Sequence, residues 1–229
     1  MPEYRVNKAE ALRYLGYSGQ NLDGLLDERV DQLIAQCEAE AAPGFVFRVF
    51  PVDASGEDGV RLVGSNLLLQ GESIRAHLEG AKECAVMACT LGLANEAGMR
   101  KAAAKGGALD ACVYGAAGSS LVECVADACE AAVVADAARR GLHANFRFSP
   151  GYGDLPLSLQ PNIVRVLQAD KRLGLTPTDS CMLVPAKSVT ALIGLFAHPQ
   201  DQKDVRRSCA GCACFNHCSL RKAKTPCYQ

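Results

Sequence analysis

Five cysteines crowd the end of this 229-residue chain, with the spacing Cys209-x2-Cys212-x-Cys214-x3-Cys218-x8-Cys227. Because the stretch around them is polar, thiolates this closely spaced are typical of zinc or iron–sulfur ligands. We expect Cys209, Cys212 and Cys218 to be three of the ligands, with Cys214 or Cys227 as the fourth. In a zinc site His217 is an alternative ligand, and a redox-labile tail without metal is the alternative interpretation.

A second stretch with chemical potential is Arg147-Phe-Ser-Pro-Gly-Tyr-Gly-Asp154. It holds an arginine, a proline, a tyrosine and two glycines in eight residues. That composition is typical of a rigid turn whose exposed backbone groups can hold a polar ligand. An ordinary strand-to-helix turn has the same composition, so the pattern alone leaves both interpretations open.

Several function classes lack support in the sequence. The four histidines are dispersed, without a His-Glu-x-x-His pair, and there is no Gly-x-Ser-x-Gly, so neither a hydrolytic zinc site nor a serine hydrolase is expected. A net charge of −1 gives no reason to expect nucleic-acid binding. No long apolar run or signal peptide is visible, so we expect no membrane association and a location in the cytoplasm.

The remaining cysteines are expected to be small core residues. In a reducing compartment a disulfide framework is not expected, and these cysteines are scattered through apolar or helical segments. They are Cys37, Cys84, Cys89, Cys112, Cys124, Cys129 and Cys181.

The elements that must position these residues follow from periodicity and turn signals. We predict helices over 7–16, with Asn7 as the N-cap, and over 22–42, 73–79, 93–105, 108–140 and 159–173. Strands are predicted over 45–52, 60–63, 66–70, 83–92, 145–148, 180–184 and 188–196. Because strands and helices alternate irregularly, we predict an α+β fold with a mostly antiparallel twisted sheet and flanking helices. The domain boundaries are set at 1–200 for this body and 201–229 for the cysteine-rich tail.

The order of motifs resembles the activation domain of cobalamin-dependent methionine synthase, in its free-standing small version. The Arg147-x-x-Pro-Gly-Tyr152 turn is followed by a helix, then Leu175-Thr-Pro-Thr-Asp-Ser-Cys-Met-Leu-Val-Pro185, Lys187-Ser-Val189 and His198-Pro199. The match covers about 120–199 clearly and 1–119 more weakly. Two positions depart from the family pattern: Gly141 stands where the family has a glutamate, and Ala191-Leu-Ile193 where it has an aromatic pair.

The resemblance implies a site for S-adenosylmethionine. By it, Arg147 pairs with the methionyl carboxylate, the backbone around Ser149 and Gly151 contacts the adenosine, and Tyr152 lines the same pocket. Glu123 matches a helix carboxylate near the ligand's ammonium or sulfonium group; without the resemblance it is an ordinary solvated side chain. A collapsed turn, with Arg147 locked in a buried pair and no cavity beside it, would argue against this site.

The function implied is reactivation of a cobalamin-dependent methionine synthase. The protein would dock on the cobalamin-carrying domain and present S-adenosylmethionine to the cobalt while an electron donor supplies an electron. Such work is positioning rather than acid–base catalysis, and whether the chain is itself an enzyme stays open. Since zinc carries no electrons, this function favours a 4Fe–4S cluster over zinc in the tail. Two alternatives remain: a zinc-stabilised module that binds a corrinoid protein but not S-adenosylmethionine, and an activator of another corrinoid methyltransferase.

Overall fold

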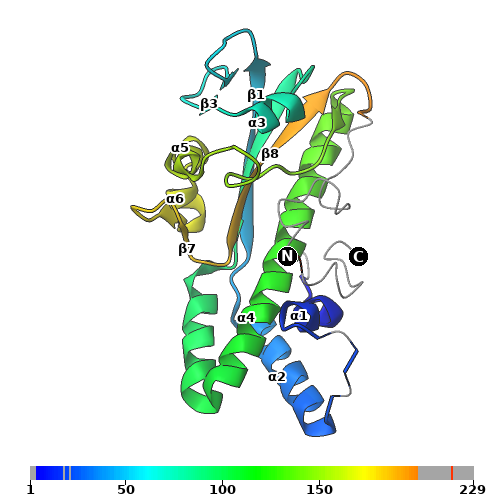
Figure 1. Cartoon of the computed structure of the whole chain (residues 1–229), viewed down its shortest axis with the longest axis vertical. Helices are drawn as coiled ribbons and strands as arrows, with labels where there is room; N and C mark the ends of the chain where they lie inside the picture. Colours follow the sequence, from blue (N-terminus) through cyan, green and yellow to red (C-terminus); the bar gives the residue numbers. More distant parts are fainter. Residues whose placement is uncertain (1–3, 18, 21, 201–217, 219–229) are drawn as a thin grey trace.

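The computed structural model describes residues 4–17, 19–20, 22–200 and 218. Its centre is an antiparallel six-stranded sheet with the strand order β3-β2-β1-β4-β8-β5, so the predicted α+β fold is confirmed (Figure 1). The strands of this sheet are β1 Gly44–Asp53, β2 Val60–Leu62, β3 Leu68–Leu69, β4 Glu83–Thr90, β5 His143–Ala144 and β8 Ser188–Phe196. A separate pair consists of β6 Thr176–Pro177 and β7 Leu183–Val184.

Helices cover both faces of the sheet. They are α1 Lys8–Tyr14, α2 Gly24–Glu40, α3 Glu72–His77, α4 Gly92–Arg139, α5 Gln160–Leu167 and α6 Ala169–Leu173, with a single 3-10 turn at Leu157–Leu159. In Figure 1, α1 and α2 lie at the lower end and α4 runs from there almost to the top, whereas α5 and α6 lie on the other side of the sheet. The N-cap predicted for the first helix is confirmed, because the Asn7 side chain accepts a hydrogen bond from the Glu10 N–H.

The central strand β4 divides the core in two. Successive side chains of a strand point to opposite faces, so Ala85, Met87 and Cys89 pack in one cluster with α1, α2 and α4. Cys84, Val86 and Ala88 pack in the other, with α3, α5 and α6. Every residue from Cys84 to Thr90 is buried, as expected for a strand covered by helices on both faces.

The long element α4 is two helices joined at a sharp reversal. Gly107 has φ +74° and ψ −158°, values that no α-helix contains and that glycine adopts without strain. The predicted helices 93–105 and 108–140 are therefore confirmed, with the break where the sequence carries two glycines. Small residues along the second half, such as Ala117 and Gly118, are buried where other elements approach closely.

Several details differ from the prediction, among them that the strand expected over 180–184 is only β7, Leu183–Val184, and that β6 was not predicted. The strand expected at 145–148 begins earlier, as β5, and is reduced to two residues. The helix expected over 159–173 is divided at Gln168, whose backbone is left-handed (φ +52°), so it becomes α5 and α6. Cys112 is exposed rather than part of the core, whereas Cys37, Cys84, Cys89 and Cys129 are buried as expected.

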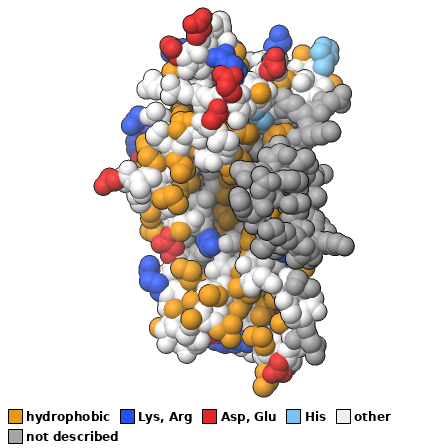
Figure 2. Space-filling view, in the orientation of Figure 1, with side chains coloured by type: hydrophobic (Ala, Val, Ile, Leu, Met, Phe, Trp, Pro, Cys, Tyr) orange, Lys and Arg blue, Asp and Glu red, His pale blue; other side chains and the backbone are white. Residues whose placement is uncertain are grey.

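The surface differs between the two ends of the face in Figure 2. Charged side chains gather at the upper end, and hydrophobic ones are frequent over the lower half. Exposed apolar side chains of the helices α2 and α4 include Leu25, Leu93 and Leu109. Among the described residues, no helix is long and apolar enough to cross a membrane.

Candidate functional site

The turn that the sequence singles out is anchored to the sheet along β8. Phe148 and Leu192 exchange two backbone hydrogen bonds of 2.9 Å, the last bridge before the turn. At Asn145 the side chain replaces the backbone carbonyl as the partner of Gly194. The Asn145 Oδ1 accepts from the Gly194 N–H at 2.7 Å, and the Nδ2 donates to the His77 carbonyl at 2.9 Å. This substitution of side chain for backbone explains why the predicted strand is not regular.

Within the turn, the backbone groups are partly used. The Gly151 N–H donates to the Leu155 carbonyl at 2.8 Å, and the Tyr152 N–H donates to the Ser149 carbonyl at 3.0 Å. Gly151 has φ +92°, a conformation that favours glycine. The Ser149 N–H donates to no described residue, whereas Tyr152 is 49% exposed. The turn therefore leaves the Ser149 N–H, among others, outside its own backbone hydrogen bonds, and the Tyr152 side chain is partly exposed.

The far end of the turn is fixed to α3. Asp154 accepts hydrogen bonds from the backbone N–H groups of Glu72, at 2.6 Å, and Ser73, at 3.0 Å. These bonds, that from Ser73 foremost, lower the pKa of Asp154. Gly71 must be glycine here, because its φ is +124° and a Cβ would lie 2.6 Å from the Asp154 Oδ1. The turn is thus held at both ends by contacts distant in sequence.

Aromatic rings pack against one another from α3 to the turn. The buried His77 ring lies 4.8 Å from that of Phe146 and 5.0 Å from that of Phe148, centroid to centroid. Phe148 in turn contacts Tyr152 edge to face at 6.1 Å. The rings form a continuous series from α3 to the exposed Tyr152, so the turn has little freedom to collapse further or to swing away.

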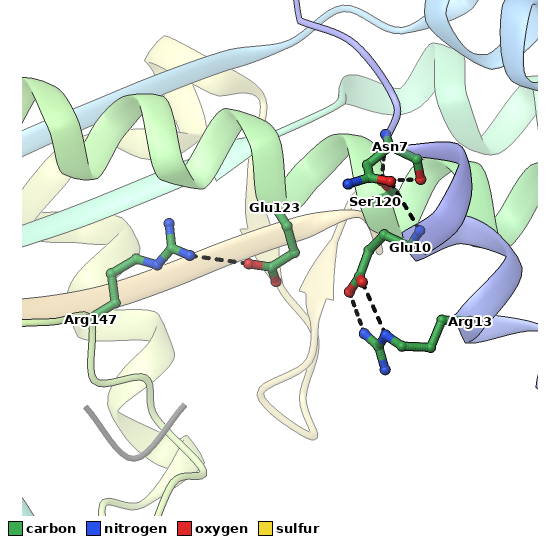
Figure 3. A network of polar contacts seen from close by, with 6 residues as sticks. All are labelled: Asn7, Glu10, Arg13, Ser120, Glu123 and Arg147. Atoms are coloured by element: carbon green, nitrogen blue, oxygen red, sulfur yellow. Dashed lines mark hydrogen bonds and ion pairs between the residues drawn. The ribbon is translucent and has the colours of Figure 1, made fainter. Parts of the chain in front are cut away.

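Arg147 begins the turn and points at α4. Its Nη2 lies 2.8 Å from Asp127 Oδ1 and 3.2 Å from Glu123 Oε2, and its Nε lies 3.3 Å from Glu130 Oε2. Figure 3 shows the guanidinium and the Glu123 carboxylate facing each other. Residues 123, 127 and 130 are spaced by four and three, so their carboxylates share one face of the helix. We call Arg147 and these three carboxylates the arginine cluster.

The members of the arginine cluster differ in exposure. The side chain of Arg147 is 8% exposed, against 19% for Glu130, 48% for Glu123 and 70% for Asp127. The Arg147 Nη1 is buried without a hydrogen-bond partner among the described residues. The guanidinium is therefore already buried and paired, which is part of the outcome that would argue against the predicted site, and a ligand carboxylate must replace Asp127 or Glu123 on it. These two are the more exposed acids of the cluster.

Helix α1 borders the cluster on its other side. Asn7 and Ser120 exchange two hydrogen bonds, at 3.1 and 3.3 Å, one helical turn before Glu123 (Figure 3). Burial, with the nearby charges of Glu10 and Glu123, raises the pKa of Tyr14 to about 12. The end of α1 therefore places Tyr14, which is 44% exposed, close to the Glu123 carboxylate. No motif in the sequence links this helix to the site.

The predicted metal ligands Cys209, Cys212, Cys214 and Cys227 lie outside the described residues; of the five, only Cys218 is described. Among the described residues there is no group of three side chains that could hold a metal ion. A surface cavity of about 190 Å³ lies apart from the turn, next to the β1–β2 connection, and is lined mainly by residues of 53–61. It includes none of the predicted site residues.

Five residues were predicted for the ligand site, and the structure brings two of them into contact across 24 positions of sequence: Arg147 and Glu123. Ser149, Gly151 and Tyr152 follow in the same turn. Asp127 and Glu130 were missed, although their spacing from Glu123 was a visible signal of one acidic helix face. Ala191, Leu192 and Ile193 are completely buried in β8, so the family's aromatic positions are core positions here.

No family model and no curated protein matches this sequence. Among solved structures, the fold is similar to the crystal structure of the MetH reactivation domain bound to AdoHcy. The TM-score is 0.63 at 16% sequence identity, over 89% of this chain and 83% of the other. At this identity the likeness establishes a shared fold: the chain has the architecture of the MetH reactivation domain.

Proposed function

We propose that this protein binds S-adenosylmethionine at the turn 147–154 and reactivates a cobalamin-dependent methionine synthase. One observation carries the proposal. Arg147 and Glu123, the two charged residues that the resemblance assigned to one ligand, meet at 3.2 Å on a fold shared with a reactivation domain whose crystal structure contains AdoHcy. The exposed Tyr152 and the Ser149 N–H beside them offer an aromatic face and a donor for a nucleoside.

The proposed reaction needs positioning rather than acid–base chemistry. The partner's cob(II)alamin is the substrate, and one electron from a donor reduces it to cob(I)alamin. The cobalt then supplies the electron pair of the new Co–C bond to the methyl carbon of S-adenosylmethionine. The C–S bond breaks with its electron pair on sulfur, leaving methylcobalamin and S-adenosylhomocysteine. The protein holds the sulfonium in reach of the cobalt, an effect of proximity.

The cysteine-rich segment 201–229 stays a proposal from sequence. We infer that it is a separate metal-binding unit with Cys209, Cys212, Cys214, Cys218 and Cys227 as candidate ligands, and that the whole protein works in the cytoplasm. When bound, a 4Fe–4S cluster would supply one-electron chemistry, whereas zinc would only stabilise the segment. Iron, sulfide and zinc analysis of anaerobically purified protein decides between them; zinc without iron ends the idea of electron transfer.

Calorimetry with S-adenosylmethionine tests the ligand site. We expect saturable binding to the wild type and at least a tenfold loss in Arg147→Ala, because the charge-assisted contact to the carboxylate disappears. Arg139→Ala is the matched control, since Arg139 is an exposed arginine near the end of α4 that pairs with Asp136 outside the arginine cluster. No heat from the wild type would contradict the proposal.

The ion pairs of Arg147 favour one alternative. A guanidinium already held by three carboxylates is also what a structural clamp looks like, so the chain could be an interaction module that binds a corrinoid protein without S-adenosylmethionine. A pull-down with the cobalamin-binding domain of methionine synthase, with and without S-adenosylmethionine, separates the two. Ligand-independent capture together with a silent calorimetric titration supports the alternative. Capture of a different corrinoid methyltransferase supports an activator of that enzyme instead.

A further inference from the structure

Lys187 is a partly buried cation to which the proposed function gives no role. It begins the Lys187-Ser-Val189 segment and directly precedes β8. Its ammonium donates a hydrogen bond to Ser119 Oγ of α4 at 2.7 Å, and no carboxylate of a described residue lies within ion-pair distance of it. Burial lowers the pKa of Lys187, because the charged form loses hydration. A partly buried ammonium without an acid beside it suits a site that receives an anion.

Contacts with α4 define the position of this ammonium. A Cβ added to Gly118 would lie 3.4 Å from Lys187 Cε and 3.5 Å from Lys187 Cγ, so the lysine stem crosses the helix at this glycine. The Ser119 hydroxyl donates to the Gly115 carbonyl at 3.1 Å and therefore meets the ammonium as an acceptor. This hydroxyl is uncharged and takes one of the three ammonium donors. Among the described residues, no other side chain accepts from the remaining two.

Along α4 the ammonium lies next to the candidate site. Ser119 precedes Glu123 by four residues, so the two side chains share one face of the helix, with Cβ atoms about 5–6 Å apart. Glu123 in turn contacts Arg147 Nη2 at 3.2 Å. Lys187 therefore lies one helical turn beyond the arginine cluster. The two cations differ in their partners, because three acids contact Arg147 and a hydroxyl contacts Lys187.

The direction of the turn along β8 also brings Lys187 into reach. Phe148 pairs with Leu192 in antiparallel register, so the chain leaves Phe148 toward the beginning of β8, where Lys187 lies. Val189 and Ile193 pack on the α4 side of the sheet, and the alternation of side chains places Lys187 on that same side. An S-adenosyl compound with its adenosine at the turn can therefore direct its amino-acid arm along α4 to Lys187.

We propose that Lys187, rather than Arg147, receives the carboxylate of S-adenosylmethionine. The inference rests on the proposed function and changes one assignment in it, which came from the resemblance. A carboxylate bound to Arg147 must displace Asp127 or Glu123 from the guanidinium. A carboxylate bound to Lys187 displaces no acid of the described residues and replaces part of the hydration that the ammonium has lost. Arg147 keeps its acids and holds the turn on α4.

Removal of the ligand carboxylate tests the inference. Decarboxylated S-adenosylmethionine has the same adenosine, sulfonium and amine but no carboxylate, and its binding to the full-length chain is measured by calorimetry. Lys187→Met keeps the apolar stem and should weaken S-adenosylmethionine about tenfold, as expected for the loss of a hydrogen bond between charged groups at a partly exposed site. The affinity for the decarboxylated compound should change less than about threefold. Lys187→Arg keeps the charge and should keep the preference for the carboxylate.

Two further variants complete the experiment. Arg147→Ala should weaken both compounds by the same factor, because Arg147 fixes the turn, and the turn holds the adenosine that both compounds share. Lys101→Met is the matched control, since Lys101 is an exposed lysine in the first half of α4. It should leave both affinities unchanged. Thermal unfolding of each variant checks that the fold is intact.

Three results overturn the inference. Equal weakening of both compounds by Lys187→Met, or no weakening of either, would mean that the lysine does not contact the carboxylate. Loss of the preference in Arg147→Ala, with its retention in Lys187→Met, would place the carboxylate on Arg147. In these cases the wild type binds, so the proposed function stands. Failure of the wild type to bind either compound removes the proposed function, and the inference falls with it.

Discussion

Two of the clusters in which helix α4 joins an arginine to acids are built in opposite ways. In the first, the buried Asp110 receives Arg29 of α2 through two contacts, one of them Nε to Oδ1 at 3.2 Å. The Asp110 side chain is 4% exposed and that of Arg29 is 41% exposed. In the arginine cluster the arginine is buried, and two of its three acids reach solvent.

The difference separates a structural pair from a candidate binding site. Asp110 and Arg29 neutralise each other through two contacts, and the pair joins α2 to α4. In the arginine cluster three acids surround one buried arginine, whose Nη1 has no hydrogen-bond partner among the described residues. The same residue types therefore occur in two arrangements, which differ in whether the acid or the arginine is buried.

Removing the structural pair should have the largest effect on stability. Asp110→Ala deletes a two-point contact between helices and should cost about 2 kcal/mol, below the roughly 3–5 kcal/mol typical of breaking a fully buried pair, because Arg29 stays hydrated. In a chain of this length we expect the Tm to fall by about 5 °C. Binding of S-adenosylmethionine should not change. A Tm within 1 °C of the wild type would show that the Asp110–Arg29 pair does not stabilise the fold.

Removing the arginine of the other cluster should change stability little and ligand binding strongly. Arg147→Met keeps the apolar stem and should cost about 1 kcal/mol, because two of the three released carboxylates, Glu123 and Asp127, reach solvent. Ligand affinity should fall at least tenfold, as for Arg147→Ala. Thermal unfolding and calorimetry on the same preparation test both statements. A loss of stability equal to that of Asp110→Ala would show that both clusters are structural.

The pH dependence of the Tm tests the contact between Asp154 and α3, which holds the other end of the turn. The pKa of Asp154 is lowered below its ordinary 3.8 by hydrogen bonds, foremost from Ser73. A lowered folded pKa contributes stability that is present above 3.8 and is lost as the pH falls through the folded value. The Tm difference between the wild type and Asp154→Asn should therefore be constant from pH 7 to 5 and shrink below pH 4. A constant difference down to pH 3 would contradict this anchor.

The smallest effect concerns one cysteine near each cluster. Cys112 follows Asp110 by two residues and is exposed, whereas Cys129 precedes Glu130 and is buried, with its pKa raised by burial to about 12. Iodoacetamide on the native protein should label Cys112 and spare Cys129, and peptide mapping by mass spectrometry checks both. Labelling of both at similar rates would mean that the helix opens around the arginine cluster.

Much of the fold could be predicted because its signals are local. The Asn7 cap, the glycine pair at 106–107 and the apolar run of β4 each determine the nearby backbone, and all three predictions are confirmed. The break at Gln168 was missed because a left-handed glutamine has no signature in sequence. The prediction of a strand at 145–148 was wrong because the Asn145 side chain replaces a backbone acceptor, and that contact depends on the position of β8.

The candidate site, too, could be predicted from the sequence only in part. The resemblance identified Arg147 and Glu123, and the structure brings them together. It did not identify the ion pairs that already hold Arg147, since these depend on how α4 passes the turn. Nor could it reveal that Asp154 caps α3, because that contact joins residues about eighty positions apart. Whether the turn binds the ligand is what the calorimetry decides.

The two outermost strands of the six-stranded sheet, β3 and β5, contain two residues each. At these two strands an incoming polypeptide finds little backbone on which to pair, a device that natural sheets use against unwanted association. We therefore expect the proposed corrinoid partner not to extend the sheet at β3 or β5, and to be recognised there through side chains and loops.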